Sequence, residues 1–174
     1  MNDAARRARW ELLGRLTEVF NDAEFLLHWL VWAALGGDSA AATAITQRLG
    51  AMDLVHLVRR LVEAGTYGGD SDGVAALMAD ASALIEARNS YVHALWGMTP
   101  IPDGGFVDAH QRLRDAVQTP DAPLVPFDAE ALGALCVRLE GFVIALAEVC
   151  ERLRPGDDGN SARVVSRSRH DGAH

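Results

Sequence analysis

The chain has 174 residues, about one domain, and its 49% hydrophobic and 23% charged content excludes a disordered protein. Its formal net charge is −8, and its 16 basic residues are all arginine. This acidic balance argues against stable DNA binding or a protein that coats nucleic acid, because phosphates must be neutralised by a cationic surface. It still allows an enzyme with a small, local cationic pocket.

The N-terminal segment predicts one long helix over residues 3–35. Its apolar residues recur three and four positions apart, as on a helix with one buried stripe. The stripe consists of Leu13, Leu16, Phe20, Ala23, Leu27, Leu30 and Ala34. Adjacent apolar positions make this face broader than a two-stranded coiled coil needs, which favours a bundle. Gly36 and Gly37 mark its end, because glycine commonly follows a helix C-terminus.

Three further helices are expected before residue 97. The first covers 39–49, where Asp38 or Ser39 can serve as N-cap, and the second covers 53–64. A loop rich in glycine and aspartate follows, and a fourth helix is expected over 74–96.

Residues 97–126 break the helical pattern. Prolines there forbid a continuous helix, and they are Pro100, Pro102, Pro120, Pro123 and Pro126. The Asp-Gly-Gly turn signal at 103–105 is flanked by short apolar runs, which predicts a β-hairpin or another extended excursion. A short helix over 106–117 is the alternative.

Asp128 is a suitable N-cap for the last helix, which Pro155 ends. Its expected buried stripe is Leu132, Leu135, Leu139, Phe142, Val143, Leu146, Val149 and Leu153. We therefore predict an all-α domain over residues 1–154, a bundle of about five helices with a Pro/Gly-rich, hairpin-like excursion before the last one. Residues 155–174 are polar and are expected to form a flexible tail.

Two cysteines bear on the compartment. Cys136 and Cys150 lie on the predicted last helix, ~21 Å apart along its axis, and cannot pair with each other. Their spacing gives no zinc signature, and two unpaired thiols suit a reducing compartment.

No segment resembles a signal peptide or reaches the ~18 uninterrupted apolar residues of a membrane span. We expect a cytoplasmic protein without membrane contact, metal or cofactor.

The predicted fourth helix carries the segment with distinctive chemistry, Arg88-Asn89-Ser90-Tyr91-Val92-His93. At ~100° per residue, five apolar side chains fall within about 60° of Arg88. They are Ala81, Leu84, Ile85, Val92 and Leu95. Because an unpaired buried guanidinium is costly, Arg88 must meet an acid or open into a wet cleft. Asn89 and His93 lie on the flank of the same face, with Glu86 close to His93 and Trp96 between Asn89 and the core.

This segment resembles the Arg-x4-6-His motif of HEPN domains, in its Arg-Asn-x-x-x-His form. A helical bundle with the motif on a late helix, followed by an excursion and a closing helix, is similar to that family too. The resemblance implies a homodimer whose two motifs form a composite, metal-independent endoribonuclease site. It also implies a toxin or defence effector that acts on RNA and has an antitoxin as a candidate partner.

The resemblance also implies roles for individual residues. His93 is expected to be the general acid or base on the RNA 2′-hydroxyl and leaving oxygen, a task for a group that titrates near neutrality. Arg88 would stabilise the phosphorane charge, and Asn89 would orient the histidine or the phosphate. The products would be a 2′,3′-cyclic phosphate and a 5′-hydroxyl. Neighbours expected to contact substrate are Glu86, Tyr91 and Trp96.

Structural interpretations compete with these roles. Arg88 could form a salt bridge to an acid on a neighbouring helix, with Asp22, Glu24 and Asp53 as candidates. The chain would then be a catalytically inactive, dimeric interaction or scaffold module. Tryptophans at helical spacing usually belong to a core or a dimer interface. His110, in the excursion, has no partner that the sequence identifies.

Overall fold

The computed structural model describes residues 3–100, 102, 106–112, 118 and 124–154. Within them the chain forms five α-helices, a 3-10 turn and a three-stranded sheet. The helices are α1 (Asp3–Ala34), α2 (Ser39–Thr46), α3 (Ala51–Glu63), α4 (Ser71–Val92) and α6 (Ala129–Arg152), and the 3-10 turn is η1 (Gly68–Asp70). The strands are β1 (Ala94–Pro100), β2 (Phe106–Arg112) and β3 (Val125–Pro126).

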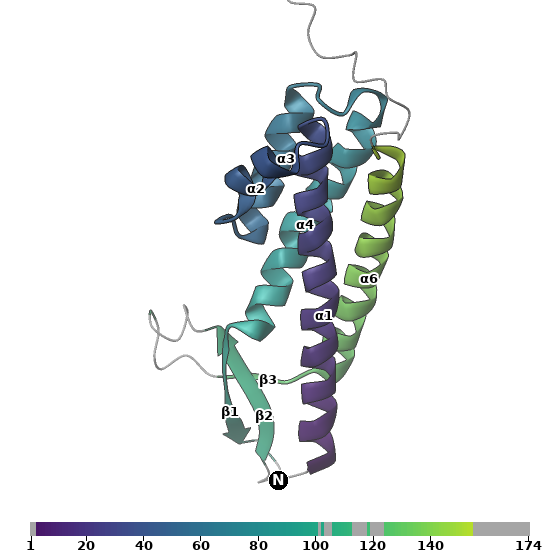
Figure 1. Cartoon of the computed structure of the whole chain (residues 1–174). Coiled ribbons are helices and arrows are strands. Elements are labelled where there is room, and N and C mark those ends of the chain that lie inside the picture. Colours follow the sequence, from purple (N-terminus) through teal and green to yellow (C-terminus); the bar gives the residue numbers. More distant parts are fainter. Residues whose placement is uncertain (1–2, 101, 103–105, 113–117, 119–123, 155–174) are drawn as a thin grey trace, which may run out of the picture.

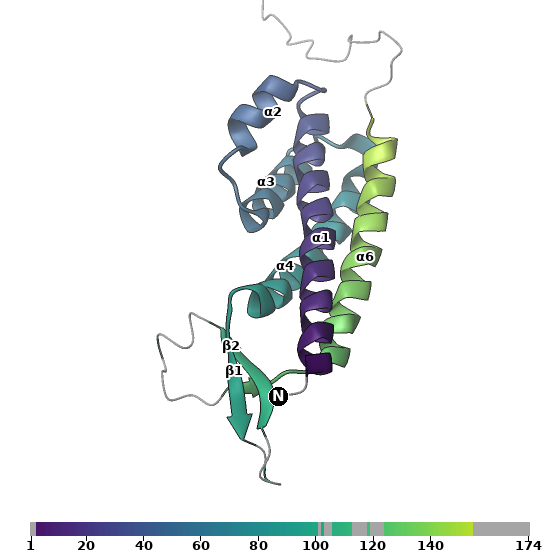
Figure 2. The ribbon, with the colours of Figure 1, turned by 60° about the horizontal axis from the view of Figure 1, so that its bottom comes forward.

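Helices α1 and α6 run side by side and in the same direction along the length of the molecule (Figure 1; Figure 2). Two buried thiols of α6 show the register of the two helices. Cys136 Sγ donates to the Leu12 carbonyl at 3.7 Å, and Cys150 Sγ donates to the Leu26 carbonyl at 3.8 Å. Both pairs are separated by 124 residues, so the two helices stay parallel without slipping. Both thiols are free, as the sequence predicts.

Helix α4 runs opposite to α1 and α6 and packs against both, while α2 and α3 lie beside the C-terminal half of α1 (Figure 1). The core lies between these helices. Its largest fully buried side chains include Leu16, Leu27, Leu30, Leu54, Met78, Leu132, Leu139 and Leu146. The predicted stripes of the first and last helices are confirmed, with only Ala34, Val143 and Leu153 partly buried. The local reason is periodicity, because the apolar residues of each helix recur on one side.

The N-caps predicted for α2 and α6 are confirmed. The Asp38 side chain accepts from the Ala41 backbone N–H at 2.9 Å, and the Asp128 side chain accepts from the Ala131 N–H at 3.0 Å. Each carboxylate satisfies an N–H that the first turn of its helix leaves without a partner. These two caps determine where α2 and α6 begin.

The region after α4 forms a β-hairpin, so the predicted hairpin is confirmed and the alternative helix is wrong over 106–112. Strands β1 and β2 are antiparallel, from Ala94 opposite Arg112 to Pro100 opposite Phe106. Strand β3 pairs with the other edge of β2, with Pro126 opposite Ala109. The predicted turn at 103–105 and the rest of the alternative helix, 113–117, lie outside the described residues. The all-α expectation is therefore corrected to a mainly helical chain with a small antiparallel sheet.

The fourth helix differs from its prediction at both ends. It begins at Ser71, three residues early, and it ends at Val92 instead of residue 96. The early end has a tertiary cause, because every residue of β1 pairs with β2 and its backbone cannot also remain helical. The predicted tail at 155–174 lies outside the described residues. None of the described helices has a stretch long and apolar enough to cross a membrane.

The packing of α1 predicts a sharp contrast between two aliphatic truncations. Leu16 is fully buried in α1, whereas Val137 on α6 is 59% exposed. Leu16→Ala should lower the free energy of unfolding by about 3 kcal/mol through lost burial and a residual cavity. Val137→Ala, the control, should change it by less than about 0.5 kcal/mol. Urea unfolding followed by circular dichroism measures both, and equal effects would contradict the placement of α1 in the core.

Candidate functional site

The predicted site residues lie where α4 ends and β1 begins. Arg88 and Asn89 are in the last turn of α4, and His93 is its C-cap, with φ −100° and ψ 26°. Trp96 is in β1 and not on the helix. The helical-wheel placement of Trp96 is therefore wrong, because the chain leaves the helix at His93. The four residues nevertheless all lie near the turn where α4 passes into β1.

Arg88 rests on an aromatic ring instead of an acid. Its guanidinium carbon lies 4.1 Å from the centroid of the Phe20 ring, and its Nη1 donates to Asn89 Oδ1 at 3.0 Å. Burial lowers the pKa of Arg88, and the charge of Glu24 partly opposes this shift. Among the described residues, no carboxylate lies within ion-pairing distance of Arg88, and its Nε has no hydrogen-bond partner. The proposed salt bridge to Asp22, Glu24 or Asp53 is not formed.

Asn89 connects the cation to the backbone of His93. Its side-chain oxygen accepts from Arg88, and its backbone carbonyl accepts from the N–H of His93 at 3.2 Å. The His93 side chain is exposed to solvent. Arg88, Asn89 and His93 are thus joined through one turn of backbone, with the imidazole open to an approaching ligand.

Glu86 lies on α4, about two turns before His93. Its side chain is exposed and forms no hydrogen bond or ion pair with His93 within the described part of the chain. Its backbone carbonyl accepts instead from Arg112 Nη2 of β2, at 3.2 Å. This contact adds a second guanidinium, on an exposed side chain, next to the last turns of α4. Strand pairing brings Arg112 to this place, since it lies 26 residues after Glu86 in the chain.

Tyr91, His110 and Trp96 form a group of rings that we call the His110 stack. The His110 ring centroid lies 5.1 Å from that of Tyr91, with 25° between the planes, and 5.1 Å from that of Trp96, with 29° between them. Burial lowers the pKa of His110, and His110 Nδ1 has no hydrogen-bond partner among the described residues. Burial also raises the pKa of Tyr91, with a smaller contribution from the charge of Asp128. Tyr91 and Trp96, which were expected to bind substrate, thus pack on His110, for which the sequence identified no partner.

Arg9 of α1 extends this cluster. Its guanidinium carbon lies 4.9 Å from the Trp96 ring centroid, and its Nη1 forms an ion pair with Asp108 Oδ2 at 3.0 Å. The side chains are only 8% and 18% exposed, so this pair is largely shielded from water. Sequence reasoning missed Arg9, although a signal was present: it lies one helical turn before Leu13, on the buried stripe of α1.

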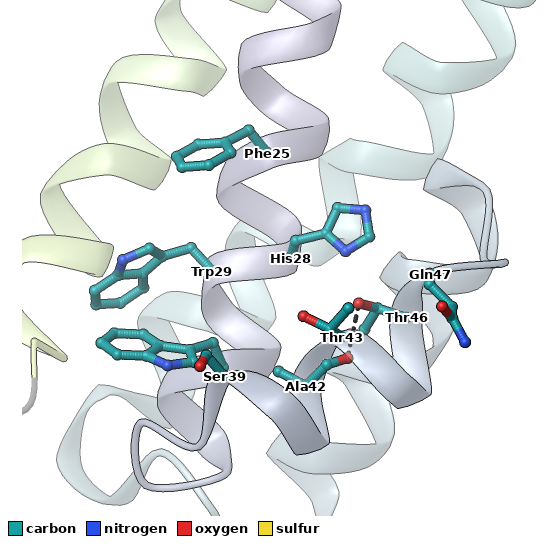
Figure 3. A pocket seen from close by; sticks show the side chains of 9 residues that line it. Phe25, His28, Trp29, Ser39, Ala42, Thr43, Thr46 and Gln47 are labelled. Atoms are coloured by element: carbon teal, nitrogen blue, oxygen red, sulfur yellow. Dashed lines mark hydrogen bonds between the residues drawn. The ribbon is translucent and has the colours of Figure 1, made fainter.

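A separate pocket of about 330 Å³ lies between α1 and α2. Figure 3 shows Phe25, His28 and Trp29 on the α1 side, with Thr43 and Thr46 on α2. Its other lining residues are Trp32, Ser39, Ala42 and Gln47. None of the predicted site residues lines this pocket, so Trp29 and Trp32 belong to a half-buried surface away from the motif.

Comparisons with known proteins give no relative. No family model matches the chain, and neither a curated protein nor a solved structure is significantly similar to it.

The environment of His110 predicts a pH-dependent stability. The unfolded chain has a histidine pKa of about 6.5, and burial makes the folded value lower. The unfolded state therefore binds the proton first, and the free energy of unfolding falls as the pH drops from about 6.5 through the folded pKa. His110→Phe keeps a ring but cannot titrate. Thermal unfolding between about pH 7.5 and about pH 5.5 should show a smaller decrease in Tm for this variant than for the unmodified protein; parallel curves would contradict the assignment.

Proposed function

We propose that this chain is a metal-independent endoribonuclease of the HEPN type, acting as a toxin or defence effector in the cytoplasm. The observation that carries the proposal is the environment of Arg88. Its guanidinium is half-buried on Phe20, is hydrogen-bonded to Asn89, and is without a carboxylate partner in the described residues. A cation held in this way is available to an external anion, and an exposed imidazole follows one turn later.

The proposed reaction is an internal transesterification of RNA. The imidazole of His93 takes the proton of the ribose 2′-hydroxyl, and the 2′-oxygen attacks the adjacent phosphorus. The bond from phosphorus to the 5′-oxygen breaks, and an imidazolium from a second copy of the chain protonates the leaving oxygen. The products are a 2′,3′-cyclic phosphate and a 5′-hydroxyl, so no water or metal enters this step.

Arg88 supports this chemistry by electrostatics. A guanidinium offers several N–H donors in one plane, a geometry that matches phosphate oxygens, and the charge on these oxygens increases as the phosphorane forms. The hydrogen bond from Nη1 to Asn89 orients the group before substrate arrives. Arg112, whose guanidinium contacts the carbonyl of Glu86, supplies a further cation for the RNA backbone. These local cations offset the −8 charge of the chain only near the motif.

A second candidate function is a non-catalytic, dimeric interaction module. The observation that favours it is an exposed aliphatic surface on α6. Val137 is 59% exposed and Ile144 is 62% exposed, and they lie two helical turns apart on one side of that helix. Exposed apolar residues grouped in this way commonly mark protein interfaces. In this case Arg88 would only complete the packing of the chain.

Cleavage of RNA in the presence of EDTA tests the first proposal. Purified protein is incubated with total RNA and with transfer RNA, beside His93→Ala and the matched control His56→Ala. His56 is also exposed but lies on α3, away from the motif. We expect His93→Ala to lose ~100-fold or more of the activity, because a general acid or base is removed, and the control to retain it. RNA left intact by the unmodified protein, or cut equally by His93→Ala, would contradict the proposal.

Arg88→Ala separates the two candidate functions. If the chain is an enzyme, this variant should lose RNA cleavage and remain a dimer in analytical ultracentrifugation. If the chain is only an interaction module, the variant should have a lower Tm or dissociate, and RNA should remain uncut by every variant. Retained stability together with lost cleavage would therefore exclude the interaction module.

A further inference from the structure

We infer that His110 is a positioning residue, whose ring bridges Tyr91 and Trp96 and thereby fixes the turn that carries His93. This inference rests on the proposed function, in which His93 is the catalytic imidazole. His110 does not contact the substrate in this proposal. It acts by holding the backbone on both sides of His93.

The bridge follows from the ring contacts. Tyr91 precedes His93 by two residues, and Trp96 follows it by three. Each of their rings stacks on His110 at a centroid distance of 5.1 Å, while the two do not pair with each other within the described residues. The segment from Tyr91 to Trp96 is therefore closed into a loop by a ring from β2.

Such a closure matters because His93 lies at a weak point of the backbone. Helix α4 ends at Val92 and β1 starts at Ala94, so His93 belongs to neither element. Helix termini fray more readily than helix interiors, and the exposed His93 side chain offers no packing that would oppose fraying. Ring contacts on both sides of His93 supply the restraint that its own side chain lacks.

The stack is anchored beyond its three rings. The Arg9 guanidinium lies 4.9 Å from the Trp96 ring centroid and is ion-paired with Asp108 at 3.0 Å. The Phe127 ring meets Trp96 edge-on at 5.6 Å, and the Phe127 N–H donates to the Asp108 carbonyl at 2.7 Å. The first turns of α1 and the segment leading into α6 thus hold Trp96. Breaking a buried ion pair leaves an uncompensated charge, so this anchor resists movement.

The bridge uses the flat face of the His110 ring. The His110 Nδ1 is buried without a partner in the described residues, and a buried polar atom without a hydrogen bond reduces stability. A phenylalanine could stack on the same rings without this cost. The positioning role needs a flat ring here and not its nitrogen atoms, which gives a rescue experiment.

The test compares His110→Ala, which removes the ring, with His110→Phe, which keeps one. Hydrogen exchange of the backbone amides of 92–95, measured by NMR, reports the turn without any substrate. We expect His110→Ala to exchange about 10-fold faster or more at these amides, His110→Phe to restore slow exchange, and the amides of α6 to stay unchanged. Unchanged exchange at His93 in His110→Ala would overturn the inference.

Kinetics on RNA provide the second readout. We expect His110→Ala to lower kcat by roughly 10- to 100-fold with little change in KM, because a displaced imidazole slows chemistry more than binding. His110→Phe should recover most of kcat, whereas a lowered kcat in both variants would overturn the positioning role. If His110→Ala fails to fold, Tyr91→Leu opens the other side of the bridge and should give the same two results. If the unmodified protein does not cleave RNA but the exchange results hold, the proposed function fails while the restraint on the turn stands.

Discussion

Because α1 is 32 residues long and apolar along one side, it contacts α6, α3 and α4 through a single buried stripe. Each of these helices buries its own stripe against α1, and the contacts of Cys136 and Cys150 show that α6 keeps a constant parallel register. A helix of this length also runs from beside the sheet to α2 (Figure 1). The position of α1 therefore determines which part of the chain can lie next to the end of α4, and so the surroundings of the candidate site.

Two arginines lie over aromatic rings near the end of α4, and they differ in the polar groups that they contact. Arg9 lies over Trp96 and is neutralised by Asp108, whereas Arg88 lies over Phe20 and has the neutral amide of Asn89. A guanidinium is weakly hydrated and tolerates such faces. The first arrangement suits a structural anchor, because its charge is already compensated. The second suits a binding group, because its charge is available to an anion.

The candidate site and the pocket lie at different places along α1. The motif, the His110 stack and the Arg9 ion pair gather where the sheet meets the helices, whereas the pocket lined by Trp29 and Trp32 lies near α2 (Figure 3). An RNA substrate approaching an acidic chain depends on local cations, which Arg88 and Arg112 provide near the motif. The residues of the proposed activity thus lie at one end of the bundle.

The sequence alone determined what local chemistry controls: the stripes of α1 and α6, the caps at Asp38 and Asp128, and the presence of an Arg, Asn and His within one short segment. It could not determine where α4 ends, because nothing from Ala94 to Trp96 breaks a helix and only pairing with β2 makes this segment a strand. Nor could it bring Phe20 under Arg88 or His110 against Tyr91. Those contacts join residues far apart in the chain, and only the packing of helices and sheet decides them.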